Sequence, residues 1–215
     1  MATDVDNHAP DELLAFWFGP EPGPHDFGLW FRASPAVDAE IRERFEPSYR
    51  AALRGELDAW DDTSRGVVAK ILLLDQLPRN MFRGTAEMFA GDDLAVALAE
   101  RLIDSGDDRS LACVERLFVY IALEHNEDVE RVRSSHRLIS ALAQECAPEE
   151  RRRYQAFVRY NRQHLEIVER FGRYPHRNEL LGRESTEEEE RFLAETSYAF
   201  MRSVYSTSSK RRKPR

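Results

Sequence analysis

Apolar residues recur at steps of three and four along most of the chain, the spacing that places side chains on one face of a helix. In the longest such stretch, the predicted buried face carries Tyr154, Phe157, Asn161, His164, Val168 and Phe171. Similar spacing predicts helices from about residue 63 to 77, 92 to 105, 111 to 125 and 128 to 146. The sequence has no strand-like alternation bounded by hairpin turns, so the pattern predicts an all-α fold.

Residues that cap or break helices mark the expected boundaries. A proline and a glycine bracket a short first helix over residues 10–19, and Ser34 followed by Pro35 opens the next. We expect Ser110 to cap the helix that follows it, and Ser185 to form a capping box with a glutamate three residues later. With short connections between them, the helices are predicted to pack as roughly seven to nine antiparallel neighbours.

Composition supports a single domain. The chain has 215 residues, 42% of them hydrophobic, and no Pro/Gly/Ser-rich linker divides it. The net charge is -8, although five of the 31 basic residues lie in the last six positions. We therefore expect one domain over residues 1–205, followed by a disordered basic tail over 206–215. The acidic body would repel phosphates, which disfavours nucleic acid as a partner.

Cellular location is predicted from what the sequence lacks. Cys113 and Cys146 show no CxxC or Cys/His ligand spacing, which disfavours a disulfide framework and a structural zinc site and favours a reducing cytoplasm. The start of the chain lacks the pattern of a signal peptide. No apolar run approaches the length needed to span a membrane, so no membrane partner is expected.

Candidate chemistry is concentrated in residues 171–183, between two glycine-containing turns. Arg173, Arg177 and Arg183 lie there with His176 and Asn178. Three guanidinium groups this close repel one another and require carboxylates or an anionic ligand. One interpretation is a connector neutralised by acidic neighbours. We favour the other, a rigid turn that presents His176, Arg177 and Asn178 into a pocket, because loops on rigid scaffolds often carry function.

Further polar residues fall on faces that should be buried. Asp75 shares the face of the apolar residues before it, and a buried carboxylate must be paired; Arg79 and Asn80 are the nearest candidates. His125 ends one apolar stripe and His164 lies within another. For each histidine alone, the simpler interpretation is a core side chain with a satisfied hydrogen bond.

Four segments together resemble the uncharacterised bacterial family DUF924. They are FWFG (16–19) with 30–31, LDQLPRN (74–80) with FRGT (82–85), ERLF (115–118) leading to His125 and 127–128, and FGRYPHRN (171–178) with LGR (181–183). The resemblance covers about residues 11 to 193 and implies a TPR-like α-superhelix, a fold that elsewhere often serves as a peptide-binding scaffold. It implies no particular activity. The chain departs from the family at 121–124, where a proline is usual, and at 195–198.

We hypothesise that these polar residues converge on one concave site that binds a small anionic ligand, a carboxylate or a phosphate. If the site is catalytic, His125 or His176 would transfer a proton, oriented by Asp75 or Glu127. The sequence contains no nucleophile elbow, P-loop or HExxH motif, so it leaves open whether the protein is an enzyme. The expected ligand-binding residues are Arg79, Asn80, His164, Arg173, Arg177 and Asn178.

Three alternatives remain. A scaffold could bind an acidic peptide, with Arg173, Arg177 and Arg183 clamping its carboxylates. A metal site could use His125, His164 and His176 with Asp75 or Glu127, but these residues lack a metal-binding spacing, so no metal or cofactor is expected. The polar residues could also form a purely structural network. The sequence leaves the oligomeric state open.

Overall fold

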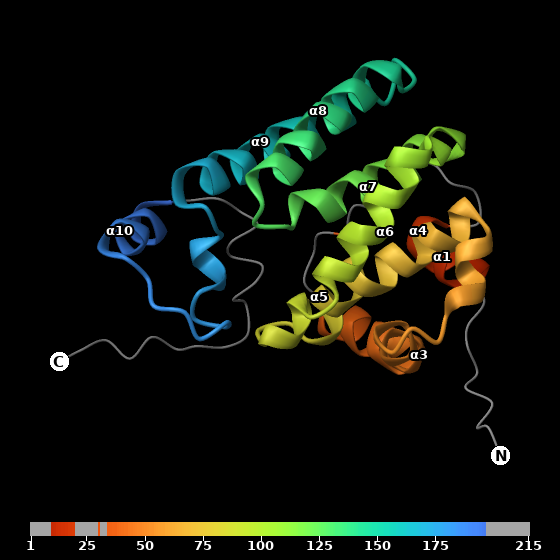
Figure 1. Cartoon of the computed structure of the whole chain (residues 1–215), viewed down its shortest axis with the longest axis horizontal. Coiled ribbons are helices and arrows are strands. Elements are labelled where there is room, and N and C mark those ends of the chain that lie inside the picture. The colour runs from red at the N-terminus through yellow and green to blue at the C-terminus, as the bar shows by residue number, and fades with distance from the viewer. Residues whose placement is uncertain (1–9, 20–29, 31–33, 197–215) are drawn as a thin grey trace.

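The computed structural model describes residues 10–19, 30 and 34–196, and helices make up its regular structure throughout (Figure 1). The α-helices are α1 (Pro10–Phe18), α3 (Pro35–Leu53), α4 (Ser64–Ile71), α5 (Leu77–Met81), α6 (Asp92–Ser105), α7 (Cys113–Glu124), α8 (Val129–Glu145), α9 (Arg151–Phe171) and α10 (Glu187–Glu195). The short helices are η1 (Asp58–Asp62), η2 (Leu72–Gln76), η3 (Ala86–Phe89), η4 (Asp107–Ser110) and η5 (Pro175–Arg177).

The prediction of an all-α fold is confirmed, since the described residues contain no strand. Consecutive helices from α6 to α9 pack on one another, and α8 and α9 form the most extensive of these pairs. In Figure 1, α7, α8 and α9 lie side by side, and η5 stands between α10 and the other helices. This stacking is compatible with a TPR-like superhelix, which remains an expectation. The predicted basic tail, 206–215, lies outside the described residues.

Aromatic side chains form the centre of the core. Trp17, Phe18 and Trp30 are buried around Phe118 of α7, with ring centroids 5.7, 5.5 and 5.0 Å from its ring. The indole of Trp30 also donates a hydrogen bond of 2.9 Å to the Trp17 carbonyl. Large rings supply much of the buried area of a core, so this group holds α1 against α7.

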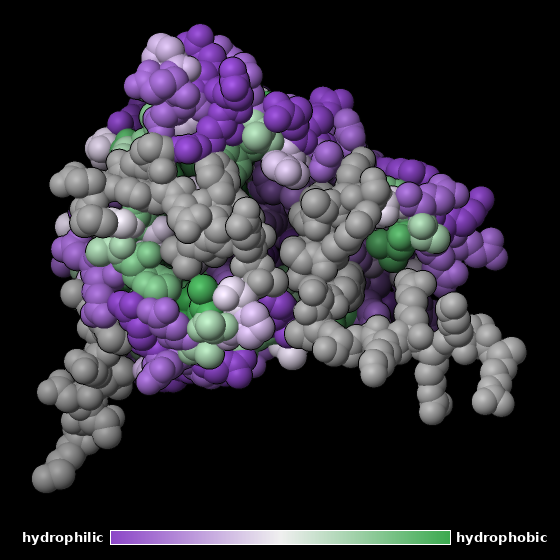
Figure 2. All heavy atoms as spheres, turned by 180° about the vertical axis from the view of Figure 1, so that it is seen from behind, coloured by the Kyte–Doolittle hydropathy of each residue, from purple (hydrophilic) through white to green (hydrophobic). Residues whose placement is uncertain are grey.

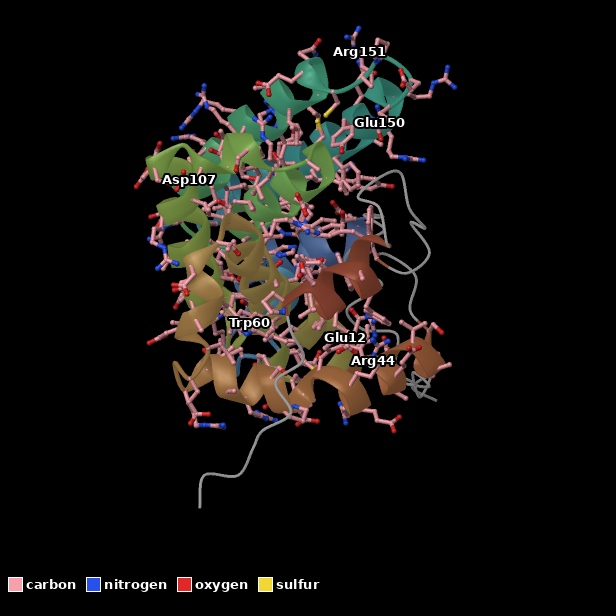
Figure 3. The ribbon with its side chains drawn as sticks, turned by 90° about the vertical axis from the view of Figure 1, so that its right-hand side faces the viewer. Glu12, Arg44, Trp60, Asp107, Glu150 and Arg151 are labelled. Carbon is pink, nitrogen blue, oxygen red and sulfur yellow. The ribbon has the colours of Figure 1, made fainter. Side chains whose placement is uncertain are left out.

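Polar residues cover much of the surface. Figure 2 shows hydrophobic side chains in separate groups among hydrophilic ones on one face of the molecule. Glu12 of α1 and Arg44 of α3 lie side by side in Figure 3 and form an ion pair of 3.1 Å. Across the described ranges, no helix has both the length and the apolar character needed to cross a membrane.

The start of α7 differs from the expectation that Ser110 caps it. Ser110 ends the short helix η4, and its hydroxyl donates to the Asp107 carbonyl at 2.7 Å. Helix α7 begins three residues later, and a carboxylate oxygen of Glu115 accepts a hydrogen bond of 3.0 Å from the amide of Ala112. A local side-chain contact thus occupies the serine that the sequence offers as a cap.

The capping box of α10 is one residue later than predicted. Thr186 accepts a hydrogen bond of 3.2 Å from the amide of Glu189, whose carboxylate accepts one of 2.8 Å from the Thr186 amide. The hydroxyl of Ser185 instead accepts a hydrogen bond of 3.0 Å from the Asn178 side chain. A tertiary contact therefore decides which of two adjacent hydroxyl residues is the cap.

A π-helical turn, η2, joins α4 to α5 in one continuous rod. All five of its residues are buried, including Asp75. Pro78 has no amide hydrogen to offer the Leu74 carbonyl four residues earlier, which disfavours regular α-helical bonding at this point. Helix α6 comes very close here, since a Cβ on Gly91 would lie 2.4 Å from the Leu74 carbonyl oxygen. The wider π-helical turn shifts which residues share a helix face, and it thereby sets where the Asp75 side chain points.

Replacing Gly91 with alanine should destabilise the fold by more than about 2 kcal/mol, because the added methyl group must displace backbone atoms of η2. The matched control is Gly55→Ala, where the Cβ meets no atom within 4 Å and the cost is backbone strain at a φ of +74°, about 1 kcal/mol. Urea denaturation of both variants measures the difference. A loss for Gly91→Ala no larger than for Gly55→Ala would contradict the close approach of α6 to η2.

Candidate functional site

Asp75 is the most deeply buried member of a group of charged side chains between η2, α5, α6, α7, α9 and η5. Its side chain is 1% exposed and lies 2.6 Å from Nδ1 of His125 and 3.0 Å from the guanidinium of Arg79. The Gln76 amide also donates to it. Burial raises the pKa of Asp75, but Arg79 and His125 outweigh it and lower the pKa to about 2.

The ionised carboxylate decides the tautomer of His125. Oδ1 of Asp75 can only accept a hydrogen bond, so Nδ1 of the ring must carry the hydrogen. In neutral His125 the lone pair therefore lies on Nε2, on the side of the ring away from Asp75. This is the arrangement in which a carboxylate orients an imidazole for proton transfer.

Arg79 of α5 connects this pair to the first residue of α6. Its two terminal nitrogens lie 2.8 and 2.9 Å from the carboxylate oxygens of Asp92, a bidentate ion pair. It also donates to the backbone carbonyl of Asp75. Burial lowers the pKa of Arg79, but Asp75 and Asp92 together outweigh burial and raise it. Arg79 therefore bridges two carboxylates that lie on different helices.

Arg177 of η5 is a buried cation with few hydrogen bonds. Its guanidinium lies 4.6 Å from the ring centre of Phe89 and 4.5 Å from that of Tyr174. The contact between its Nη1 and Asp92 is long, 3.4 Å, and Nε is buried with no hydrogen-bond partner in the described part of the chain. Burial lowers the pKa of Arg177, and nearby Arg79 adds to this effect. Its charge is thus only partly compensated.

The loop that presents Arg177 is anchored by Glu127. Gly172 ends α9 with a φ of 66°, a left-handed conformation that favours glycine. The Tyr174 amide then donates to Glu127 at 2.8 Å, and Arg183 forms a bidentate pair with the same carboxylate at 2.6 and 2.9 Å. The sequence offered Glu127 as a group to orient a histidine. The structure instead places it as the anchor of the loop.

A second histidine and carboxylate pair lies between α7 and α9. Nδ1 of His164 is 3.0 Å from the carboxylate of Glu124 and 2.9 Å from the Tyr160 carbonyl. The other carboxylate oxygen of Glu124 accepts a hydrogen bond of 2.7 Å from Asn161, which also donates to Ser135 at 2.9 Å. Burial lowers the pKa of His164, although Glu124 opposes the effect. The ring of His164 is therefore neutral near pH 7.

His176 is the most enclosed of the three histidines near Arg177. The residue is 4% exposed, and its ring centre lies 5.5 Å from that of Tyr174. Burial lowers its pKa well below the usual range, and Arg177 adds to this effect. His125, whose side chain is 16% exposed, is better placed to meet a ligand.

The structure thus brings six of the predicted site residues together: Asp75, Arg79, His125, His164, His176 and Arg177. Three residues complete the group that we call the central cluster: Asp92, Glu124 and Tyr174. Ring contacts connect the two histidine pairs to Arg177. The ring centres of His125 and His164 are 6.4 Å apart, and those of His164 and Tyr174 are 5.7 Å apart. The Tyr174 ring in turn packs against the guanidinium of Arg177. Residues that are far apart in the sequence therefore form one connected set of contacts.

Three predicted ligand-binding residues lie outside the central cluster. Asn80 donates to Asp38 of α3 at 2.8 Å. Arg173 forms a bidentate pair with Glu189 of α10 at 2.7 and 2.8 Å. Asn178 donates to Ser185 and to the same Glu189 carboxylate at 3.0 and 3.3 Å. Each of these three side chains therefore pairs with a carboxylate outside the central cluster.

Sequence reasoning missed the three other members of the central cluster. Asp92 appears in the sequence only as the start of a predicted helix, and Glu124 only as the end of the stretch that departs from the family. Tyr174 lies inside the arginine-rich loop, but its hydroxyl donates to the Glu124 carbonyl, a contact across 50 residues. A useful signal for Glu124 is its place at the end of a helix face that is otherwise apolar.

The donor arrangement does not favour a metal. Among the residues that the structure describes, no group of three or more His, Cys, Asp or Glu side chains is placed to hold an ion. Nδ1 of His125 and Nδ1 of His164 each contact a carboxylate. Two guanidinium groups lie in the same cluster, and their positive charge would repel a metal cation.

Fold and site together define an all-α protein with a buried cluster of arginine, histidine and carboxylate side chains. The sequence model of the family described as "Bacterial protein of unknown function (DUF924)" matches residues 13–197, and the chain belongs to this family. The predicted resemblance is therefore confirmed.

A solved structure is also similar, that of the protein of unknown function ATU0120 from Agrobacterium tumefaciens. The two chains are 36% identical, with a TM-score of 0.75, and the match covers 87% of this chain and 97% of the other. No curated protein matches the chain.

Replacing Asp75 with asparagine should lower the free energy of unfolding by about 3 kcal/mol, because Arg79 and His125 lose a buried charged partner. The wild-type pKa of about 2 is below the unfolded value, so its contribution, about 2 kcal/mol, is present above pH 4 and is lost as the pH falls toward 2. The variant should lack this part of the acid profile. Urea denaturation between pH 7 and pH 2 measures both effects.

The control is Asp11→Asn, whose wild-type side chain is 84% exposed. This change should alter the free energy of unfolding by less than about 0.5 kcal/mol at any pH. If Asp75→Asn matched the wild type in both stability and acid profile, the buried pairing of Asp75 would be wrong.

Proposed function

We propose that the protein binds a small anion, a carboxylate or a phosphate, at the central cluster. The observation that carries this proposal is the state of Arg177. Its guanidinium is buried between two aromatic rings, its Nε has no hydrogen-bond partner in the described residues, and its contact with Asp92 is 3.4 Å long. A buried cation whose hydrogen bonds are incomplete is costly, and an anion that accepted them would remove that cost.

The edge of the cluster that reaches the surface supports the same function. The side chains of Arg79 and His125 are each 16% exposed, whereas Asp75 behind them is 1% exposed. A ligand that entered there would meet hydrogen-bond donors first and the carboxylate last. Nε2 of His125, on the far side of the ring from Asp75, is the atom that would exchange a proton with the ligand if the site is catalytic.

A peptide-binding scaffold is less well supported. That alternative requires Arg173, Arg177 and Arg183 to clamp the carboxylates of a peptide. Two of the three already form bidentate pairs within the chain, Arg173 with Glu189 and Arg183 with Glu127. Only Arg177 among them lacks such a partner in the described residues, and one arginine suits a small ligand better than an extended one.

The proposal predicts that phosphate or malonate raises the melting temperature of the wild type with saturable dependence on concentration. Arg177→Gln should abolish this shift. The matched control, Arg170→Gln, removes the same charge from a side chain that is 52% exposed and paired with Glu188, and it should keep the shift. Differential scanning fluorimetry at constant ionic strength provides the measurement.

The stability of the variant without any anion separates binding from a structural network. Because Arg177→Gln removes a buried charge that is poorly compensated, its melting temperature should equal or exceed that of the wild type. A large fall in melting temperature, with no anion-dependent shift in the wild type, would instead support a structural role for Arg177.

A further inference from the structure

The charges of the central cluster limit how an anion can bind. Two guanidinium groups, Arg79 and Arg177, face three carboxylates, Asp75, Asp92 and Glu124. Counting only these arginines and carboxylates, the described members of the cluster carry one more negative charge than positive. A ligand with two negative charges would be repelled unless the cluster also gained a proton, because like charges interact strongly at low dielectric.

Glu124 is the carboxylate that lacks a cation. Asp75 and Asp92 both contact arginines, whereas the side-chain contacts of Glu124 in the described residues are with Asn161 and His164. Asn161 is neutral. Protonation of His164 would therefore give this buried carboxylate its cationic partner.

The two histidines both approach a carboxylate through Nδ1. His125 meets Asp75 at 2.6 Å and His164 meets Glu124 at 3.0 Å. Nδ1 of His125 is hydrogen-bonded to its carboxylate, whereas Nδ1 of His164 is hydrogen-bonded to the Tyr160 carbonyl beside Glu124. In both rings Nε2 is therefore the nitrogen through which the ring would act on a ligand. The difference is that Asp75 is also neutralised by Arg79. The carboxylate beside His164 is therefore the one whose negative charge is not neutralised by an arginine.

The surroundings of His164 hold its ring neutral in the absence of a ligand. On α9 its own neighbours are the Tyr160 carbonyl and Asn161, and α8 contributes His136, which contacts Asn161 at 2.8 Å. The charged or titratable groups that face it from other segments are Glu124 and His125 at the end of α7, Tyr174, and His176 and Arg177 of η5. Arg177 and the two histidines oppose protonation, whereas Glu124 favours it. An anion that paired with Arg177 would neutralise one of these opposing charges.

We infer that the central cluster binds a dianion together with one proton. His164 takes up this proton, because the adjacent Glu124 carboxylate stabilises the charged ring. The inference rests on the proposed function and extends it to the charge of the ligand. The proton comes from solvent and adds to Nε2, whose N–H becomes a donor to the anion, while Nδ1–H stays directed at the Tyr160 carbonyl beside Glu124. Glu124 acts here as a positioning residue. Binding should therefore tighten as the pH falls, because the complex holds one proton more than the free protein.

Sulfate is the probe for the test, because it remains a dianion between pH 6 and 8 and every proton taken up then belongs to the protein. Isothermal titration calorimetry in buffers of different ionisation enthalpy measures the number of protons taken up. We expect an uptake approaching one proton per sulfate, and an association constant that rises by up to about tenfold per pH unit as the pH falls.

His164→Gln retains an amide donor but cannot titrate, so it should bind sulfate more weakly than the wild type at pH 6, without proton uptake and with little pH dependence. The control is His136→Gln, which removes a histidine that contacts Asn161 but no carboxylate, and it should retain the uptake. Histidine nitrogen NMR of the wild type gives a measurement that does not depend on the folding of a variant. One imidazole should become protonated when sulfate is added at pH 7.

The outcomes separate the inference from the proposed function. Sulfate binding without proton uptake would overturn the inference and leave the anion site intact. Uptake that persisted in His164→Gln but disappeared in His125→Gln would assign the proton to the wrong histidine and also overturn it. No binding of sulfate, phosphate or malonate by the wild type would reject the proposed function itself.

Discussion

The pairing of the buried Asp75 carboxylate with Arg79 and His125 is the constraint on which the rest of the site depends. A carboxylate that is 1% exposed must be matched by positive charge or hydrogen bonds, so the end of α7 and the start of α5 are both fixed against η2. Arg79 then extends the same constraint to α6 through Asp92, and Asp92 extends it to η5 through Arg177. One buried charge therefore determines how five segments meet.

A buried network of this kind is a poor way to stabilise a fold. Apolar side chains of similar volume are often as stabilising or more so, because charged groups lose their hydration when they are buried. The aromatic group around Phe118 already provides a well-packed core between α1 and α7. Sequences tend to keep polar residues at sites that packing would fill with apolar ones when function requires them. The π-helical turn that directs Asp75 fits the same view, since such turns are frequent at functional sites.

Membership of the DUF924 family describes the fold and brings no activity with it, so the functional argument must come from the site. The arrangement combines Arg177, a buried cation whose hydrogen bonds within the described residues are incomplete, with two imidazoles that each contact a carboxylate. That combination suits an anionic ligand and a proton better than it suits a metal. It also gives the two histidine pairs different roles: His125 lies at the surface edge with a neutralised carboxylate, and His164 lies deeper on a carboxylate that has no arginine.

The sequence by itself determined the helices and identified most members of the central cluster. Spacing of apolar residues predicted the helices, and the position of Asp75 on an apolar face predicted its burial and its pairing with Arg79. Tertiary structure decided the remaining partners. Asn80, Arg173 and Asn178 contact carboxylates outside the cluster, while Asp92 enters it to meet Arg177 across 85 residues of chain. The reason is physical: helical periodicity is a local property that the sequence displays directly, whereas an ion pair depends on distances that exist only after the helices have packed.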